Sequence, residues 1–394
     1  MLGRIFHGNS QNIHPINIVF CPNFLNFIDN YIIIFFHIKF ILTPFLKTKI
    51  VFKMNKDILS FNYKKPILIA EISGNHMQSK SRFLKLIDTA FKNGADLVKI
   101  QTYEPQDITL NIRNKFFKIK KGLWKNKYLW QLYENAHTPF KWHRSAFDIA
   151  KKHKKIIFSS PFSKRGVDLL EKLNVKLYKV ASFEITDLKL INYIASKRKP
   201  IILSTGIATI LEIKNAIKEI NKFHDKILIL HCVSNYPTNL KDSNLSRIND
   251  LKKIFKKYKI GLSDHTNDIF SSIASYGYGI AAIEKHFNLD KKKTTDSSFS
   301  INPKQLNNLS NILKDLSNPS RKIGELNGNM IKLRRSIYAA EDIKKNEKFT
   351  SKNIETFRPK LGLCASQYYK IIGKKSKKKI KKGSPIFKNS VLNF

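Results

Sequence analysis

Cysteine is scarce in this 394-residue chain, which contains only three such residues. Cys21, Cys232 and Cys364 are odd in number and lie far apart. This spacing matches neither a disulfide framework nor a structural zinc site, because both need paired or clustered cysteines. The scarcity of cysteine therefore favours a protein of the reducing cytoplasm.

Long uninterrupted hydrophobic runs are also missing. The apolar stretch at residues 31–46 is short for a membrane span and is broken by His37, Lys39 and Pro44. It lacks the neighbouring small-residue cleavage site that a signal peptide needs. Met54, by contrast, leads directly into a candidate first strand. We therefore expect residues 1–53 to be a non-native or disordered extension, and we expect no membrane partner.

Acidic residues are few, with 29 Asp and Glu against 72 Lys and Arg, so the formal net charge is +43. Such an excess raises the possibility of nucleic-acid binding. The lysines, however, are spread over the whole chain together with abundant isoleucine and asparagine, as AT-rich codons would produce. The run Lys374–Lys382 is then better explained as a solvated face. We expect no nucleic-acid partner, while the basic surface favours small anionic molecules.

From Lys65 onward, short β-branched runs alternate with amphipathic helical stretches. The expected strands are residues 66–72, 96–102, 155–162, 177–184, 200–206, 227–233, 259–265 and 282–287. Helices are expected at residues 82–93, 139–152, 187–197 and 210–222, and after the last strand at residues 303–316. Strands that alternate with helices pair in parallel, and eight of them over about 250 residues predict a closed (β/α)₈ TIM barrel.

The composition changes after this repeating region. A polar stretch, SNPSRKIGELNGN, has linker character, and from Ile331 short β-like pieces are punctuated by glycine and proline. The sequence thus predicts a barrel domain at residues 54–317, a linker at 318–330 and a small, mainly-β domain at 331–394. A domain of about 60 residues is marginal alone and often rests on a partner surface.

The segment Glu104–Thr138 is too long for an ordinary connection between a strand and a helix. It contains Trp124, Tyr128, Trp130 and Tyr133. Two interpretations remain open, since these aromatic residues can shape a substrate pocket or form a small core beneath a surface loop.

Polar residues stand at the end of every predicted strand, which is where barrels of this type place their chemistry. The residues expected there are Glu71, Lys99, Gln101, Ser159, Ser160, Lys179, Ser182, Glu184, Ser204, His231, Cys232, Tyr236, Ser263, His265, Glu284 and His286. Each of them has an ordinary structural explanation when taken alone. Together they indicate one polar rim.

Two kinds of site can be built from this rim. Two lysines and several serines that converge there form an anion site suited to phosphate plus carboxylate. Histidines on two adjacent strands, His265 and His286, suit a divalent metal that keeps positions open for substrate. Residue types alone do not separate Mn²⁺, Mg²⁺ and Zn²⁺.

Eight blocks of the sequence resemble, in order and spacing, the signature blocks of the sialic acid synthase family. They are IAEISGNH, VKIQT, SSPF, YKVASFE, ILSTG, HCVSNYPT, GLSDHT and IEKHF, within residues 66–317. The tail from Arg334 resembles the antifreeze-like (SAF) domain that closes these enzymes. The resemblance implies a TIM barrel followed by a mainly-β SAF (β-clip) domain.

Members of this family are transferases that condense phosphoenolpyruvate with an open-chain amino sugar and water, giving a nine-carbon 2-keto acid and phosphate. The resemblance implies phosphoenolpyruvate contacts from Lys99, Ser160, Lys179, Ser182, Ser204 and Ser263. It implies catalytic roles for Glu71, Glu184 and His265. His265 and His286 would bind the metal, with Mn²⁺ or Mg²⁺ favoured. Tyr236 and Arg358 would contact the sugar, and Arg358 would reach the partner's site in a domain-swapped homodimer.

Two segments resemble the pseudaminic acid synthase branch of this family. They are SFEITDLKLI, in place of the SGE typical of N-acetylneuraminic acid synthases, and LYENAHTPFKWH at Leu132–His143. This branch uses 2,4-diacetamido-2,4,6-trideoxy-β-L-altropyranose, and aromatic residues between Trp124 and Trp142 suit a 6-deoxy sugar. The alternatives are an N-acetylneuraminic or legionaminic acid synthase, an aldolase with a lysine Schiff base, and a basic nucleic-acid-binding protein.

Overall fold

The computed structural model describes residues 4–5, 16–17, 59–318 and 328–394. The extension expected at residues 1–53, apart from the short antiparallel pair β1 (Arg4–Ile5) and β2 (Ile16–Asn17), lies outside these residues, as does most of the expected linker. The chain divides into two compact units, Met1–Ser317 and Asn318–Phe394. Each unit has a hydrophobic core of its own.

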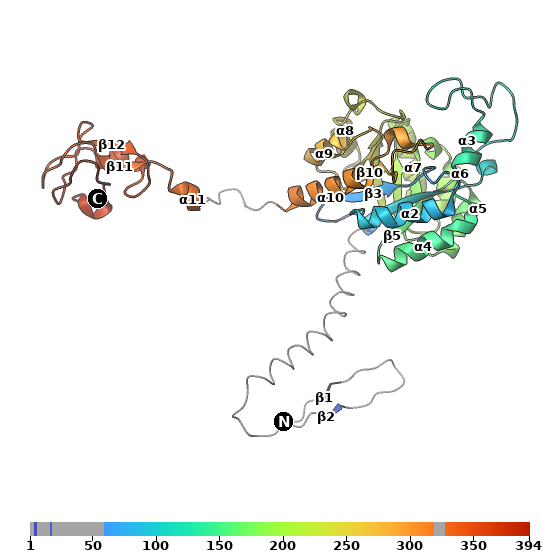
Figure 1. Cartoon of the computed structure of the whole chain (residues 1–394), viewed down its shortest axis with the longest axis horizontal. Coiled ribbons are helices and arrows are strands. Elements are labelled where there is room, and N and C mark those ends of the chain that lie inside the picture. Colours follow the sequence, from blue (N-terminus) through green and yellow to red (C-terminus); the bar gives the residue numbers. More distant parts are fainter. Residues whose placement is uncertain (1–3, 6–15, 18–58, 319–327) are drawn as a thin grey trace. The chain divides into compact units, whose positions relative to one another are not determined.

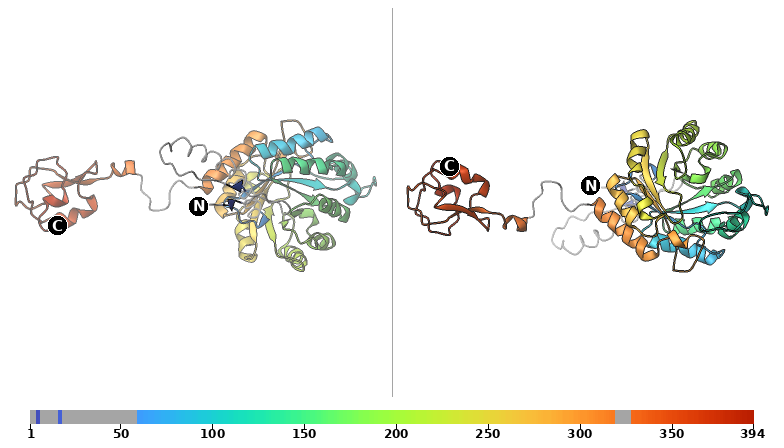
Figure 2. Two further views of the ribbon diagram at one scale, coloured as in Figure 1. Left: turned by 90° about the horizontal axis from the view of Figure 1, so that it is seen from below. Right: turned by 90° about the horizontal axis from the view of Figure 1, so that it is seen from above.

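The first unit contains a closed barrel of parallel strands in the order β10-β3-β4-β5-β6-β7-β8-β9. Figure 2 shows these strands inside a ring of helices. The strands are β3 (Ile67–Glu71), β4 (Leu97–Thr102), β5 (Ile156–Pro161), β6 (Tyr178–Val180), β7 (Ile201–Ser204), β8 (Ile227–Cys232), β9 (Lys259–Asp264) and β10 (Ala282–His286). The predicted (β/α)₈ barrel is confirmed.

The barrel strands are nearly continuous apolar runs because both of their faces are covered. All five residues of β3 and all six of β5 and β8 are buried. In a parallel barrel the outer face packs against helices and the inner face packs against the other strands, so period-two alternation of apolar and polar residues is lost. Polar side chains are instead concentrated at the carboxyl ends of the strands.

The surrounding helices begin at recognisable caps and turn one apolar face to the barrel. Ser79 and Thr209 each accept a hydrogen bond from a backbone N–H of the first turn of α2 and α7. The buried residues of α2 recur with helical spacing, as Phe83, Leu86, Ile87, Ala90 and Phe91. The helices are α2 (Lys80–Lys92), α3 (Leu129–Ala136), α4 (His143–Lys152), α5 (Lys164–Lys172), α6 (Leu188–Ala195), α7 (Ile210–Asn221), α8 (Arg247–Ile254), α9 (Phe270–Ser275) and α10 (Pro303–Ser317).

Two sequence-based boundaries are wrong. The strand predicted at residues 177–184 ends at Val180, and Ser182–Glu184 forms the 3₁₀ helix η3. The helix predicted from residue 139 is preceded by a separate 3₁₀ turn, Phe140–Trp142, and α4 begins only at His143. In the first case the Ser182 side chain accepts a hydrogen bond from the Gly206 amide on the neighbouring β7–α7 connection, a long-range contact without a local signal.

The second unit is small and mainly β, as predicted. Strands β11 (Ser336–Ala339) and β12 (Ile354–Phe357) pair antiparallel, and short helices lie at α11 (Gly328–Ile331) and α12 (Tyr368–Ile371). Its core is formed by Ile337, Ala339, Ile343, Phe349, Ile354, Leu363, Ile371, Ile380, Ile386 and Val391. Within the part of the chain that the structure describes, no helix is both long and apolar enough to cross a membrane.

Candidate active site

A cavity of about 600 Å³ lies at the carboxyl ends of the barrel strands. Most of the residues that the sequence places at this rim contribute to its lining. They are Lys99, Gln101, Ser160, Lys179, Ser182, Glu184, Ser204, Tyr236, Ser263, His265, Glu284 and His286. The structure therefore brings together the whole set predicted for phosphoenolpyruvate and both predicted metal ligands.

Five of the highlighted residues do not line the cavity, and one of them, Cys232, is buried with its Sγ 3.1 Å from Ser182 Oγ. Ser159 is turned toward the Ile100 carbonyl, and the Nε2 atom of His231 lies 2.9 Å from the Ser243 carbonyl oxygen. Glu71 is completely buried, and Arg358 is an exposed residue of the second unit. The roles predicted for Glu71 and Arg358 stay predictions.

Glu71 lies next to lining residues rather than at the surface of the cavity. Its Oε1 accepts a hydrogen bond from Gln101 Nε2 at 3.1 Å, and its Oε2 lies 3.3 Å from Lys99 Nζ. Burial raises the pKa of Glu71, and the nearby Lys99 charge opposes this effect only in part. Glu71 can thus influence the cavity through Lys99 and Gln101.

The floor of the cavity is a charged cluster centred on Glu284. Its Oε1 atom accepts hydrogen bonds from Lys99 Nζ at 2.7 Å, Lys179 Nζ at 3.3 Å and Ser263 Oγ at 3.1 Å. These four residues come from β4, β6, β9 and β10, and each is at most 4% exposed. One carboxylate therefore joins strands from opposite sides of the barrel.

The electrostatics of this cluster favour an anionic ligand. Burial lowers the pKa of Lys179 to about 8, although Glu284 acts in the opposite direction. Burial also acts to lower the pKa of Lys99, but Glu284 and Glu71 outweigh it and the net pKa is raised. For Glu284, burial is outweighed by the two ammonium groups, so its pKa is lowered. Two ammonium groups therefore share the Glu284 carboxylate at the floor, with Glu71 beside Lys99, and the same ammonium groups can face a bound anion.

Hydroxyl groups around the floor are available as donors. Ser160 and Ser204 are each 2% exposed, and their Oγ atoms have no hydrogen-bond partner among the described residues. Buried hydroxyls without a partner are costly, and a bound phosphate or carboxylate oxygen would satisfy them. Ser182 accepts a hydrogen bond from the Gly206 amide at 3.1 Å, and its Oγ also lies 3.1 Å from Cys232 Sγ.

Gly206 is required by this packing. A Cβ atom at this position would stand 2.2 Å from Ser234 Oγ and 2.6 Å from Cys232 Sγ. A side chain at this position would therefore force Ser234 and Cys232 to move at the cavity wall.

His265 and His286 face the same cavity with ring centroids 5.4 Å apart. The Nδ1 atom of His265 lies 2.9 Å from the Val233 carbonyl oxygen, and because a carbonyl can only accept, Nδ1 carries the proton. Its Nε2 is then a free lone pair. Burial, followed by the neighbouring His286, lowers the pKa of His265 to about 3, so the ring is neutral at pH 7.

His265 and His286 are suited to bind a divalent cation that takes only a few of its ligands from the protein. Neutral imidazole with its second nitrogen held by a carbonyl is the usual form of a metal-binding histidine. Within residues 59–318 and 328–394, no group of three or more His, Cys, Asp and Glu side chains is arranged to hold a metal ion. A cation at His265 and His286 would therefore complete its coordination with water and substrate oxygens.

Two further carboxylates face the cavity. Burial raises the pKa of Glu184 to about 7, against the opposing charge of Lys179. Asp296 is 5% exposed, and its Oδ2 lies 3.6 Å from His286 Nδ1. Burial acts to raise the pKa of Asp296, but His286 outweighs it and the pKa is lowered. Glu184 can thus exchange a proton near neutral pH, whereas Asp296 stays charged.

The sequence predicts no role for Glu284, and Asp296 is not among the predicted site residues. Glu284 shares a strand face with His286, so the period-two rule places it at the rim, but its partners on β4 and β6 follow only from barrel closure. Asp296 lies in a polar connection after β10, where neither periodicity nor a motif distinguishes it.

The long segment after β4 forms one wall of the cavity. It includes the loop that precedes α3 in Figure 1. Trp124 and Tyr133 line the cavity, while Tyr128 and Trp130 are not among the lining residues. Of the two interpretations left open for these aromatic residues, the pocket-forming one applies to Trp124 and Tyr133.

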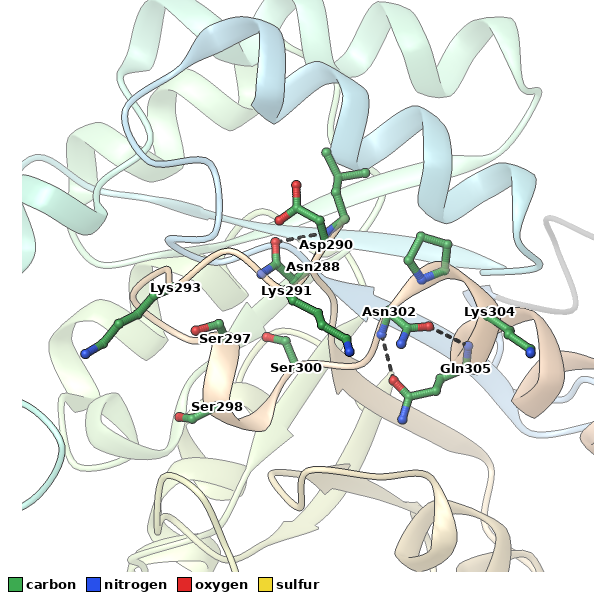
Figure 3. A pocket seen from close by; sticks show the side chains of 12 residues that line it. Asn288, Asp290, Lys291, Lys293, Ser297, Ser298, Ser300, Asn302, Lys304 and Gln305 are labelled. Atoms are coloured by element: carbon green, nitrogen blue, oxygen red, sulfur yellow. Dashed lines mark hydrogen bonds between the residues drawn. The ribbon is translucent and has the colours of Figure 1, made fainter.

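A second cavity, of about 820 Å³, lies beside the connection between β10 and α10. Figure 3 shows that Lys293 and Lys304 point to opposite sides of it and that Asn302 and Gln305 are joined by hydrogen bonds. It contains none of the residues predicted to bind substrate or metal, so the candidate active site is the smaller cavity at the strand ends.

Comparison with known proteins agrees with this geometry. Residues 86–324, more than half of the chain, match the NeuB family, and residues 334–392 match the SAF domain. The chain belongs to the NeuB family. The resemblance to sialic acid synthases, the TIM barrel and the SAF domain are confirmed together.

Individual NeuB relatives cover most of the chain. The pseudaminic acid synthase of Helicobacter pylori is 40% identical, over 82% of this chain and 96% of that protein. The N,N'-diacetyllegionaminic acid synthase of Campylobacter jejuni is 34% identical, over 81% and 98%. The crystal structure of an N-acetylneuraminic acid synthetase from Leptospira borgpetersenii, in complex with citrate, has a TM-score of 0.59 and 27% identity, and the match covers 68% of this chain and 90% of that one.

Proposed function

We propose that this NeuB-family chain is a pseudaminic acid synthase. It would condense phosphoenolpyruvate with 2,4-diacetamido-2,4,6-trideoxy-β-L-altropyranose and water to give pseudaminic acid and phosphate. The observation that carries the reaction type is the meeting, in one cavity, of a floor with two lysine ammonium groups and a pair of imidazoles. The higher identity to a pseudaminic acid synthase than to a legionaminic acid synthase supports the choice of sugar.

Phosphoenolpyruvate would bind at the floor. Its phosphate and carboxylate match the charges of Lys99 and Lys179, and its oxygens match the free hydroxyls of Ser160 and Ser204. Fixed donors of this kind hold the enol carbon in line with the second substrate, which removes much of the entropic barrier to a two-substrate reaction.

The sugar aldehyde would lie above the floor, beside His265, His286 and Tyr236. A divalent cation held by the two histidines, with Mn²⁺ or Mg²⁺ favoured, would supply Lewis-acid stabilisation of the negative charge on the aldehyde oxygen. The chain's own contribution is to orient both rings, His265 through the Val233 carbonyl and His286 beside the Asp296 carboxylate.

The bond changes follow from the substrates. Carbon 3 of phosphoenolpyruvate bonds to the aldehyde carbon, and the aldehyde oxygen takes up a proton. A water oxygen then bonds to carbon 2, and the bond from carbon 2 to the phosphate oxygen breaks. Glu184, with a pKa of about 7, is suited to accept the proton of the water or to donate one to the new hydroxyl. Glu71 would assist through Lys99 and Gln101.

We also propose that the protein is a homodimer of the reducing cytoplasm. Cys232 and Cys364 are free thiols in the described part of the chain, which supports a reducing location. Arg358 is exposed on the second unit, which supports its proposed reach into the site of a partner subunit. Sedimentation equilibrium of the intact protein measures the oligomeric state directly, and a monomer at micromolar concentration contradicts the dimer.

The direct test is phosphate release from phosphoenolpyruvate in the presence of Mn²⁺ and a panel of sugars. The panel contains the diacetamido altrose and the sugar substrates of legionaminic and N-acetylneuraminic acid synthases. The expected result is that kcat/KM is highest for the diacetamido altrose. A higher kcat/KM for another sugar of the panel would assign the chain to the synthase branch that uses that sugar. Covalent trapping of substrate by borohydride would instead indicate an aldolase with a lysine Schiff base.

The affinity for phosphoenolpyruvate is expected to fall above about pH 8. Lys179 carries its charge below its pKa of about 8 and loses it above, so one of the two positive charges at the floor is lost as the pH rises. The pH profile of kcat/KM for phosphoenolpyruvate reports the free enzyme and measures this step. In a Lys179→Arg variant the alkaline fall should move to higher pH, because arginine stays charged. An identical fall in both proteins contradicts the assignment.

A further inference from the structure

The cavity has two chemically different regions. Its floor carries the charged residues described above, whereas the region around its mouth is largely apolar, with the exposed Lys121 as its charged member. The apolar side chains there are Ile108, Ile119, Leu123, Trp124, Leu129 and Phe183. A ligand that spans the cavity thus meets charge at one end and hydrocarbon at the other.

Much of this apolar region belongs to a hairpin formed by residues 117–129. The Ile119 amide donates to the Lys127 carbonyl and the Leu129 amide donates to the Phe117 carbonyl, both at 2.9 Å. These bonds give the segment a defined backbone, although it lies between β4 and α3. Its tip is therefore a built part of the cavity.

Trp124, at this tip, is linked to the histidine pair through the ring of Tyr236. Its ring centroid lies 6.0 Å from that of Tyr236, which in turn lies 4.5 Å from that of His265. The adjacent Leu123 is 47% exposed although it lines the cavity, and so is Phe183, at 61%. Exposed hydrocarbon that faces a cavity is surface that a ligand can remove from water.

Trp142, which ends the aromatic segment identified in the sequence, offers no such exposed surface to the cavity. Trp142 is 7% exposed and does not line the cavity. Its ring packs at 5.8 Å from Phe83 and 5.5 Å from His76, measured between centroids. The segment between Trp124 and Trp142 therefore does not act as one unit, and only its hairpin tip is available to substrate.

We propose that Leu123 and Trp124 determine sugar specificity by receiving the methyl-bearing groups at the distal end of the sugar. This inference rests on the proposed function. The reacting aldehyde carbon must lie near the floor and the two histidines, so carbons 4 to 6 extend toward the mouth. In a 4-acetamido, 6-deoxy sugar these carbons carry two methyl groups, which the hairpin tip covers. A sugar with hydroxyls there leaves the same hydrocarbon in contact with polar groups.

The expected discrimination is moderate, as it is for other apolar pockets. One methylene in a hydrophobic pocket changes kcat/KM by roughly 10- to 200-fold. Removing the Trp124 side chain should therefore raise the KM for the diacetamido altrose about 10-fold or more. The KM for phosphoenolpyruvate and kcat at saturation should change less than about two-fold, since the floor is untouched.

The test uses the full-length protein with the variants Trp124→Ala and Leu123→Ser. Phe116→Ala is a matched control, because Phe116 lies in the same segment, is 79% exposed and does not line the cavity. Each protein is assayed for phosphate release with the diacetamido altrose. An analogue with a hydroxyl in place of the 4-acetamido group is then measured as a competitive inhibitor, so its affinity is obtained even without turnover.

The inference expects both cavity variants to bind the diacetamido altrose more weakly and to lose the preference over the analogue, while Phe116→Ala behaves like the wild type. It is overturned if the preference is unchanged in Trp124→Ala, or if Phe116→Ala reduces it equally. A wild-type protein that releases phosphate with a different sugar of the panel instead refutes the proposed function, so the two failures are distinguishable.

Discussion

Replacing His265 by alanine is expected to lower kcat on the order of 10³-fold while the barrel stays folded. The change removes one of the two imidazoles that face the cavity, and with it the Nε2 lone pair offered to a cation. The fold should tolerate the loss, because the bond to the Val233 carbonyl contributes only about 1 kcal/mol. Phosphate release measures kcat, calorimetric titration with Mn²⁺ measures metal binding, and thermal unfolding measures stability.

His231→Ala is the matched control for this experiment. His231 is 1% exposed and also lies near the end of a barrel strand, but it does not line the cavity. It should lower Tm at least as much as His265→Ala and leave Mn²⁺ affinity unchanged. Retained turnover or retained Mn²⁺ affinity in His265→Ala would show that this residue is not a metal ligand.

Replacing Glu284 by alanine is expected to have the second large effect, on stability as well as on activity. The change leaves Lys99 and Lys179 buried without their shared carboxylate. Breaking a buried charge pair costs about 3–5 kcal/mol, which corresponds to a Tm lowered by roughly 6–12 °C. Phosphoenolpyruvate should restore part of this loss, because its anionic groups neutralise the same ammonium groups.

The control is Glu171→Ala. Glu171, at the end of α5, bonds to Lys199 and to Tyr178, and none of these three residues lines the cavity. Because the Glu171–Lys199 pair is partly exposed, Glu171→Ala should lower Tm less than Glu284→Ala does. Phosphoenolpyruvate should stabilise Glu171→Ala to the same extent as the wild type. If phosphoenolpyruvate stabilises Glu284→Ala no more than wild type, the anion does not bind at these lysines.

The alternation of elements could be predicted from the sequence because it depends on local patterns. Apolar runs such as residues 67–71 and the helical spacing of Phe83, Leu86 and Ala90 identify strand and helix without knowledge of the rest. The boundary at residue 180 could not be predicted, since the chain beyond it is held by the amide of Gly206, on the connection after the next strand.

The composition of the site was predictable to a similar degree. Because strand ends meet at one rim, Lys99, Lys179, His265 and His286 could be placed there by their positions alone. No such positional rule predicts how deeply a side chain at the rim is buried. Glu71 stands at a strand end and is nevertheless fully buried, while Trp124, in a loop without a strong periodic signal, faces the cavity.

The order of strands and helices and the kinds of side chain at the rim follow from the sequence by itself, because period and residue type act over a few neighbouring positions. The tertiary structure alone decided which groups touch. Only closure of β10 onto β3 encloses a barrel interior in which the Glu284 carboxylate meets ammonium groups from β4 and β6, 185 and 105 positions away. Contacts across such separations depend on the packing of the whole barrel, which no local pattern records.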